Sequence, residues 1–152
     1  MKKILGALLL LAFCGCTSIN VPNYIQDKYP YKKMFYAPFD RVYPATVKAL
    51  EDSGWTVEEE TDPALFELGR EVDANGVKQT LVFTKIRQFS FFLGSQYTRL
   101  NAYLRVTPDK AVEVEIRYLR ITSTMFKAFN KFRNDRAVDR IFKRIEQSLN
   151  AP

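Results

Sequence analysis

The chain has 152 residues and no histidine, and its 23 lysines and arginines exceed its 17 acidic residues by six. The absence of histidine excludes serine–histidine triads and imidazole metal sites, and it removes the commonest general base. A chain of this length can bury one core, so we expect a single folded domain.

The N-terminus has the organisation of a signal peptide. Two lysines precede an apolar run over residues 4–13, which ends shortly before Cys16. Ten residues of helix span only ~15 Å, half the ~30 Å hydrocarbon core of a bilayer, so this run is too short to remain as a membrane span. We therefore expect residues 1–15 to be removed on export.

The residues Phe13-Cys14-Gly15-Cys16 resemble the bacterial lipobox. In such signals the final cysteine is diacylated through its sulfur, the chain is cleaved ahead of it, and the new N-terminus is acylated. The resemblance implies a lipid anchor on Cys16, and two or three acyl chains hold a protein to a membrane almost irreversibly. An ordinary signal peptide is the alternative, but it would leave an exported protein with an unpaired thiol. With Cys16 modified, disulfides and nucleophilic cysteine chemistry are excluded.

Thr17 follows the expected lipidated cysteine. By resemblance to the enterobacterial sorting rule, a residue other than aspartate at this position favours the outer membrane. We therefore expect an outer-membrane lipoprotein that faces the periplasm, and the rule leaves exposure at the cell surface open.

Residues 17–38 contain three prolines and five aromatic residues, and they show neither a helical nor a strand period. We interpret residues 16–38 as a lipidated, extended tether. In one interpretation residues 31–39 pack on the domain itself, and in the other the extended segment binds a partner.

The folded domain is predicted to begin at residue 39. Asp40 can cap a helix that runs to about Ser53, and Gly54 stands where a left-handed stop is needed. A strand over residues 55–61 follows.

Four more strands are predicted after this first one. Residues 65–72 and 77–87 alternate between polar and apolar, and Asn75-Gly76 between them favours a type I′ hairpin turn. Strands over residues 97–106 and 111–122 follow. The first of these two carries Thr98, Leu100, Ala102, Leu104 and Val106 on one face and Tyr97, Arg99, Asn101, Tyr103 and Arg105 on the other.

A last helix is predicted over residues 135–149, with Asn134 as its cap. Its apolar stripe, which must face a sheet, consists of Val138, Ile141, Phe142, Ile145 and Leu149. The order of a helix, about five antiparallel strands and a helix predicts an α+β fold of two layers over residues 39–152, with the helices on one face of the sheet.

The helix that begins Phe39-Asp40-Arg41-Val42 and ends before Gly54-Trp55, followed by acidic strands, is similar to that of small envelope lipoproteins with a helix-grip domain. One such family is the C subunit of the outer-membrane β-barrel assembly machine, and the resemblance covers the element order of residues 39–149. It implies a helix-grip fold and a structural role as a scaffold in an assembly. It would make the segment after Cys16 the analogue of that subunit's N-terminal segment, which contacts a partner lipoprotein. No functional residue is carried over.

Catalysis is not expected. The candidate carboxylates at positions 58, 59 and 60 are consecutive on a strand, so neighbours point to opposite faces of the sheet. No glycine-rich phosphate loop and no acidic metal motif of recognised spacing occurs in the sequence. We predict no cofactor and no metal.

Residues 117–144 carry nine bases against two acids, and residues 123–134 interleave aromatic side chains with Lys127, Lys131 and Arg133. The aromatics form a satellite core in one interpretation. In the other, the segment docks on an acidic envelope protein or on anionic lipid. Export argues against nucleic acid as the partner. The sequence predicts a membrane-anchored, non-catalytic protein-interaction or assembly module, with these three bases as candidate partner-binding residues.

The alternative function is a lipoprotein that binds lipid or another small hydrophobic ligand, because a sheet curled around a helix can leave an apolar pocket. Phe89, Phe91, Phe92 and Leu93 would then line the mouth of that pocket. Otherwise this apolar connection closes the core or projects outward.

Overall fold

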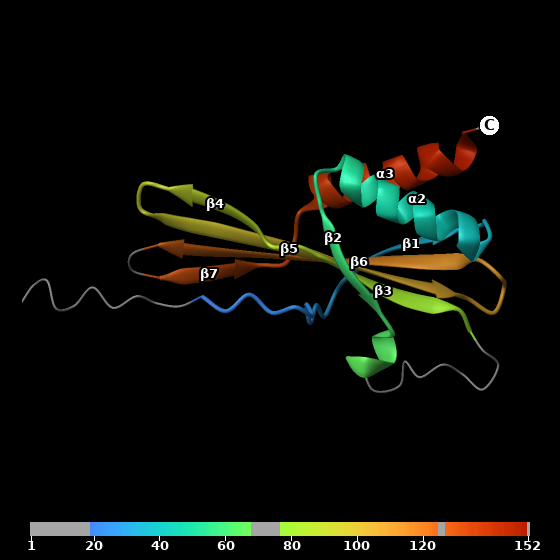
Figure 1. Cartoon of the computed structure of the whole chain (residues 1–152), viewed down its shortest axis with the longest axis horizontal. Helices are drawn as coiled ribbons and strands as arrows, with labels where there is room; N and C mark the ends of the chain where they lie inside the picture. Colours follow the sequence, from blue (N-terminus) through green and yellow to red (C-terminus); the bar gives the residue numbers. More distant parts are fainter. Residues whose placement is uncertain (1–18, 68–76, 125–126, 152) are drawn as a thin grey trace, which may run out of the picture.

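The computed structural model describes residues 19–67, 77–124 and 127–151. Its strands and helices follow one another along the chain as shown in Figure 1. In chain order they are β1 (Tyr31–Phe35), α2 (Phe39–Asp52), β2 (Val57–Thr61), the short 3-10 helix η1 (Pro63–Leu65), β3 (Gln79–Thr84), β4 (Arg87–Phe91), β5 (Gly94–Val106), β6 (Val112–Thr124), β7 (Ala128–Lys131) and α3 (Asp135–Asn150).

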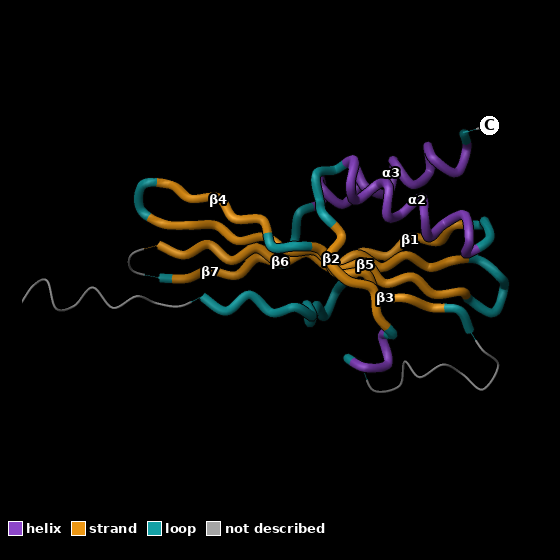
Figure 2. The backbone as a smooth tube through the Cα atoms, in the orientation of Figure 1, coloured by secondary structure: helices purple, strands orange, loops and turns teal. Residues whose placement is uncertain are grey.

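The strands form one antiparallel sheet with the order β1-β6-β5-β3-β2, in which β4 also pairs with β5 and β7 with β6. The centre of the sheet is a hairpin of β5 and β6, each 13 residues long. One half of this hairpin is flanked by β1 and β3, and the other half by β7 and β4. Both helices lie on the same face of the sheet (Figure 2). The predicted α+β arrangement is confirmed.

The core lies between the two helices and the half of the sheet that contains β1 and β3. Val138, Ile141 and Ile145 of α3 are fully buried, as the periodicity of that helix predicted. The sheet presents to them the alternating apolar residues of β5 and β6, such as Leu100 and Val114.

Both helices end within two positions of the predicted residue. Of the two predicted N-terminal caps, Asn134 is confirmed and Asp40 is not. Asn134 caps α3, because its side chain accepts a hydrogen bond from Ala137 N at 3.3 Å. Gly54 has the expected left-handed conformation, with φ of 81°. The prediction that Asp40 caps the first helix is wrong. The cap is Pro38, two residues earlier, since its carbonyl already accepts from Arg41 N and Val42 N.

The predicted strand over residues 65–72 is wrong where the structure describes it. Asp62 accepts a hydrogen bond from Ala64 N, and Pro63 with its fixed φ starts a 3-10 turn that ends at Leu65. Phe66 and Glu67 are not in a strand either. The remainder of that prediction, with the turn at 75–76, lies outside the described residues.

The predicted strand over residues 77–87 is divided into β3 and β4. Both pair with the same edge of β5, but the register shifts by one residue between Phe83, opposite Asn101, and Arg87, opposite Thr98. The Thr84 hydroxyl causes this break, because it donates to Leu100 O at 2.9 Å and accepts from Leu100 N at 3.1 Å in place of backbone groups.

Residues 31–39 pack on the domain, in agreement with the first of the two interpretations of this segment. Tyr31–Phe35 forms β1, which pairs along β6, and Phe35 is buried in the core. The boundary expected at residue 38 therefore does not separate tether from domain in the structure. The part of the expected tether before β1, residues 19–30, is called the lead below.

Candidate docking surface

The far half of the central hairpin extends beyond the two helices. With β4 and β7 it forms a four-stranded projection, which we call the arm (residues 87–98, 120–124 and 127–131). Figure 1 shows the arm to the left of the helix layer, with no helix over it. This half of the sheet therefore has a face that the core does not use.

The tip of the arm carries exposed apolar side chains. Phe92, in the turn between β4 and β5, is 99% exposed, and Phe89 is 66% exposed. The other exposed apolar residues of the tip and edges are Phe91, Leu93 and Phe129. These residues do not close the core, nor do they line an opening between sheet and helices. They project outward, and an exposed apolar patch of this kind marks a surface for interaction.

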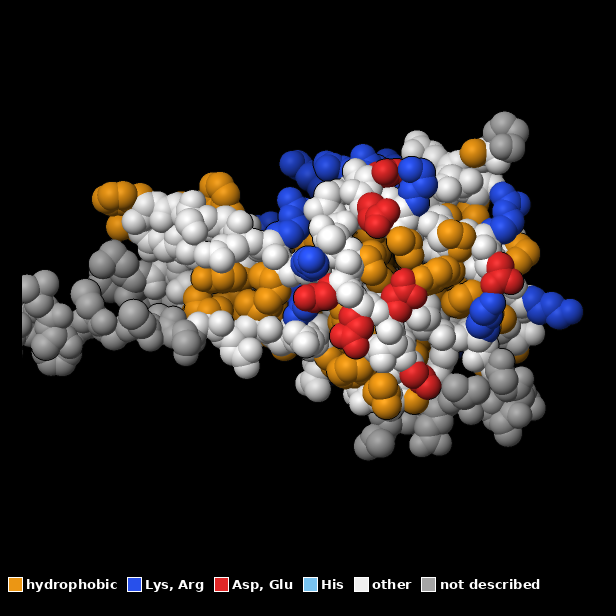
Figure 3. Space-filling view, viewed as in Figure 1, with side chains coloured by type: hydrophobic (Ala, Val, Ile, Leu, Met, Phe, Trp, Pro, Cys, Tyr) orange, Lys and Arg blue, Asp and Glu red, His pale blue; other side chains and the backbone are white. Residues whose placement is uncertain are grey.

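The arm contains no acidic residue. Residues 85–98 and 118–134 include six bases, whereas all 17 acids of the chain lie elsewhere. Figure 3 shows the same division, with red side chains over the helix-covered part of the molecule and none on the projection. Four of these bases, Arg87, Arg120, Lys127 and Lys131, lie on the arm, and Lys85 and Arg133 lie just outside it. The arm therefore combines positive charge with exposed aromatic rings.

Two of the three predicted partner-binding residues lie on the arm. Lys127 and Lys131 are exposed at its β7 edge, and the Lys127 ammonium lies 5.3 Å from the centre of the Phe129 ring. The interpretation of the segment as a satellite core is wrong for Phe129 and Phe132, which are 53% and 37% exposed. Residues 125 and 126 lie outside the described part.

Arg133, the third predicted residue, holds parts of this chain together. Its guanidinium lies 3.7 Å from the centre of the Tyr31 ring and donates to Tyr29 O at 3.1 Å and to Asp135 Oδ1 at 3.2 Å. Tyr31 donates to the same carboxylate at 2.6 Å. That hydrogen bond lowers the pKa of Asp135 below its usual 3.8, while burial, followed by the bond to Asp135, raises the pKa of Tyr31 to about 12.

The lead covers the reverse face of the sheet. Ile25 is fully buried against Leu119 and Ile121, and Ile19 and Val21 pack on the same cluster. In Figure 2 the lead runs beneath the sheet, on the side opposite the helices, and reaches the arm. Cys16, the predicted lipidation site, lies outside the described residues. It stands three positions before Ile19 in the sequence, a separation of at most about 10 Å along an extended chain.

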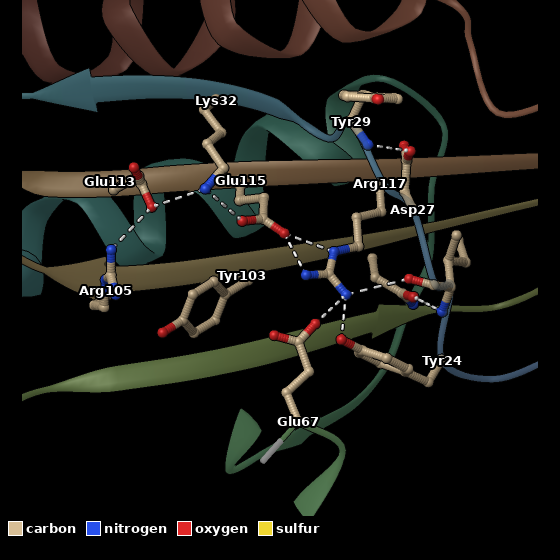
Figure 4. Close-up of polar contacts among 12 residues, drawn as sticks. Tyr24, Asp27, Tyr29, Lys32, Glu67, Tyr103, Arg105, Glu113, Glu115 and Arg117 are labelled. Carbon is tan, nitrogen blue, oxygen red and sulfur yellow. Dashed lines mark hydrogen bonds and ion pairs between the residues drawn. The ribbon is translucent and has the colours of Figure 1, made fainter. Parts of the chain in front are cut away.

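Buried polar groups fasten the lead to the sheet. Arg117, 4% exposed, donates to Glu115 at 2.6 Å, pairs with Glu67 at 2.6 Å and donates to the backbone oxygen of Ile25 at 3.2 Å. It also donates to the Tyr24 hydroxyl and lies over that ring at 5.0 Å (Figure 4). We call this set of contacts the Arg117 cluster.

Two neighbouring residues of β5 extend the attachment. Asn101 accepts from Ile25 N at 2.7 Å and donates to Asn23 O at 3.1 Å. Arg99 donates to Asn23 Oδ1 and to Glu58, both at 2.5 Å. The sequence predicted that Arg99 and Asn101 share a face of this strand, but it did not indicate what they contact. The Arg117 cluster was missed, although alternation of Glu113, Glu115 and Arg117 with valine and isoleucine was its visible signal.

The described residues contain no group of three or more side chains suited to hold a metal ion. In the same ranges, no helix is both long enough and apolar enough to cross a membrane. No protein-family model and no curated protein matches the chain.

Proposed function

We propose that this chain is an envelope lipoprotein, anchored through lipid on Cys16, whose domain is a non-catalytic protein-interaction module with the arm as its docking surface. The observation that carries the proposal is the arm itself, which combines a complete lack of acids with exposed aromatic rings at its tip and edges. The resemblance to the C subunit of the β-barrel assembly machine belongs to the same proposal, since it suggests scaffold work in the outer membrane.

The edges of the arm suit a protein partner. Within the described ranges, β4 pairs only with β5 and β7 only with β6, so each strand has an outer edge that pairs with no other strand. Such an edge can accept an added strand through backbone hydrogen bonds. The lysines beside it would attract an acidic partner, because complementary charge raises the rate of association.

The lipid anchor would keep the arm near its partner. The lead packs under the arm and begins three positions after Cys16 in the sequence, so a lipid on Cys16 would hold the docking surface within a short distance of the membrane. A tethered surface meets membrane-bound partners at a high effective concentration, and modest contacts then suffice.

Reversing the two exposed lysines at the β7 edge tests the docking surface. In Lys127→Glu/Lys131→Glu we expect crosslinking to an envelope protein in intact membranes to slow about tenfold at low ionic strength, because electrostatic steering is lost. The fold should survive, since exposed charges contribute less than ~1 kcal/mol each. Arg133 is left unchanged because it holds the lead and α3.

The matched control is Lys110→Glu/Lys143→Glu, which makes the same change in net charge at exposed positions away from the arm. This control should crosslink at the wild-type rate. Equal rates for a folded arm variant and the control at low salt would mean that the two arm lysines are only a solvated surface.

The second candidate function is binding of lipid, and the fully exposed Phe92 favours it. A fully exposed phenylalanine at the tip of an arm whose β7 edge carries two lysines suits the interface of an anionic bilayer. In this case the Lys127→Glu/Lys131→Glu variant would keep its protein crosslinks and lose contact with anionic vesicles.

A further inference from the structure

A polar hollow of about 230 Å³ lies where the arm meets the helix layer. It is bordered by the end of α2, the first turns of α3 and the strands β4, β5 and β6, which converge in Figure 1 at the base of the arm. Its lining residues are Ser53, Trp55, Arg87, Gln96, Thr98, Tyr118, Arg120, Asn134, Ala137 and Arg140, none of which is acidic.

Three arginines from three different elements meet at this hollow, namely Arg87 of β4, Arg120 of β6 and Arg140 of α3. None of them forms an ion pair with a carboxylate in the part of the chain that the structure describes. Three guanidinium groups around one hollow repel one another, and an anion between them would offset that repulsion.

Neighbouring aromatic side chains hold two of these arginines in place. The Arg87 guanidinium lies 4.8 Å from the centre of the Trp55 ring. Arg120 donates through Nε to the Tyr118 hydroxyl at 3.0 Å. Both contacts leave other N–H groups of each guanidinium without a described partner, since an arginine has five. Arg87 and Arg120 are therefore held in position before a ligand binds, and each retains N–H donors for that ligand.

The start of α3 adds a smaller contribution, because Asp135 in its first turn carries a negative charge, which Tyr31 and Arg133 already bind. Asn134, which caps this 16-residue helix, and Ala137 in its first turn both line the hollow. The N-terminal end of a helix carries about half a positive charge and attracts anions. Gln96 and the Ser53 hydroxyl, which accepts from Arg144 at 3.1 Å, supply further neutral hydrogen-bonding groups.

We infer that this hollow binds a phosphate group. Guanidinium groups recognise phosphate oxygens through paired hydrogen bonds, and three of them carry enough positive charge to balance a dianion. The phosphate can come from a soluble phosphate compound or from the headgroup of an anionic lipid. The inference does not depend on the proposed docking at the arm tip, because it rests on residues at the arm base.

Trp55 makes a direct test practical, because it is the only tryptophan of the chain and it lines the hollow. The full chain in uncharged detergent is titrated with sodium phosphate, and with sodium chloride at matched ionic strength, while Trp55 fluorescence is recorded. We expect a saturable change with phosphate and none with chloride. Arg120→Gln and Arg140→Gln should each weaken binding about tenfold, which corresponds to about 1.4 kcal/mol. Lys143→Gln, on an outward part of α3, should bind as the wild type does.

The source of the phosphate is distinguished by reconstituting the same proteins into phosphatidylcholine vesicles with and without phosphatidylglycerol. A Trp55 response to phosphatidylglycerol alone, lost in the two arginine variants and kept in Lys143→Gln, would support the inference with a lipid headgroup as ligand. The inference is overturned if neither probe changes Trp55 fluorescence. It is also overturned if the arginine variants, with unchanged circular dichroism, respond as strongly as Lys143→Gln.

Discussion

Replacing Cys16 with serine is expected to abolish incorporation of labelled fatty acid and to move the mature protein from the detergent phase to the aqueous phase. Each buried methylene of an acyl chain contributes ~0.8 kcal/mol, so two or three chains dominate membrane attachment. No helix of the described residues could replace them as a membrane span. Labelling with a fatty-acid analogue followed by detergent phase partitioning measures both effects.

Cys14→Ser is the matched control, because it alters the other cysteine of the lipobox-like segment and should leave lipid on Cys16. The chain has two cysteines, so the pair of variants assigns the modified residue unambiguously. A cleaved Cys16→Ser protein that still partitions into detergent would contradict a single lipid anchor.

Replacing Arg117 with methionine is expected to lower the free energy of unfolding by ~3–5 kcal/mol, as is usual when one partner of a buried ion pair is removed. Glu115 is fully buried and lies 2.5 Å from the Arg117 guanidinium, so the variant removes a closely paired cation from a carboxylate in the interior. The loss is a large share of the ~5–15 kcal/mol that stabilises a typical domain. Urea denaturation followed by circular dichroism measures it.

The same sheet face offers a control for this variant. Arg105 pairs with Glu113 at 3.4 Å but is 44% exposed, so Arg105→Met should cost less than ~1 kcal/mol. Adding Glu115→Gln to Arg117→Met should recover part of the loss, since it removes the buried charge. If Arg117→Met and Arg105→Met unfold at the same urea concentration, the Arg117 cluster does not stabilise the fold.

The elements with a clear period could be predicted from the sequence. The apolar stripe of α3 and the Asn134 cap gave its position, and strict alternation gave the two faces of β5. Local signals of this kind depend on near neighbours in the chain. The break between β3 and β4 could not be predicted in this way, because it depends on the Thr84 hydroxyl bonding to Leu100 on another strand.

The sequence left open whether the aromatic residues of the arm are buried or exposed, and it did not predict that the hairpin extends beyond the helices. Element lengths contain a signal that could have indicated it. The 13 residues of β5 and of β6 extend ~43 Å at ~3.3 Å per residue, whereas the 16 residues of α3 cover ~24 Å at ~1.5 Å per residue. Helices of this length can cover little more than half of the hairpin. Phe89 and Phe129 lie on the uncovered half.

The contacts of the lead depend on residues far apart in the sequence, and alternation alone could not pair them. Arg117 contacts Tyr24 and Ile25 more than 90 positions away. The sequence placed polar residues on the reverse face of the sheet, a face that usually meets solvent. The lead covers that face, and so the buried Arg117, Glu115 and Asn101 became visible only in the structure.

The most direct test of the docking surface is a photoreactive amino acid at position 92, activated in intact membranes. Tyr36 is the matched control position, because its side chain is 85% exposed and it follows β1, outside the arm. We expect position 92 to crosslink strongly to an envelope protein, or to lipid if the second candidate function holds, and position 36 to give only background. Crosslinks at position 92 that do not exceed those at position 36 would contradict the arm as the docking surface.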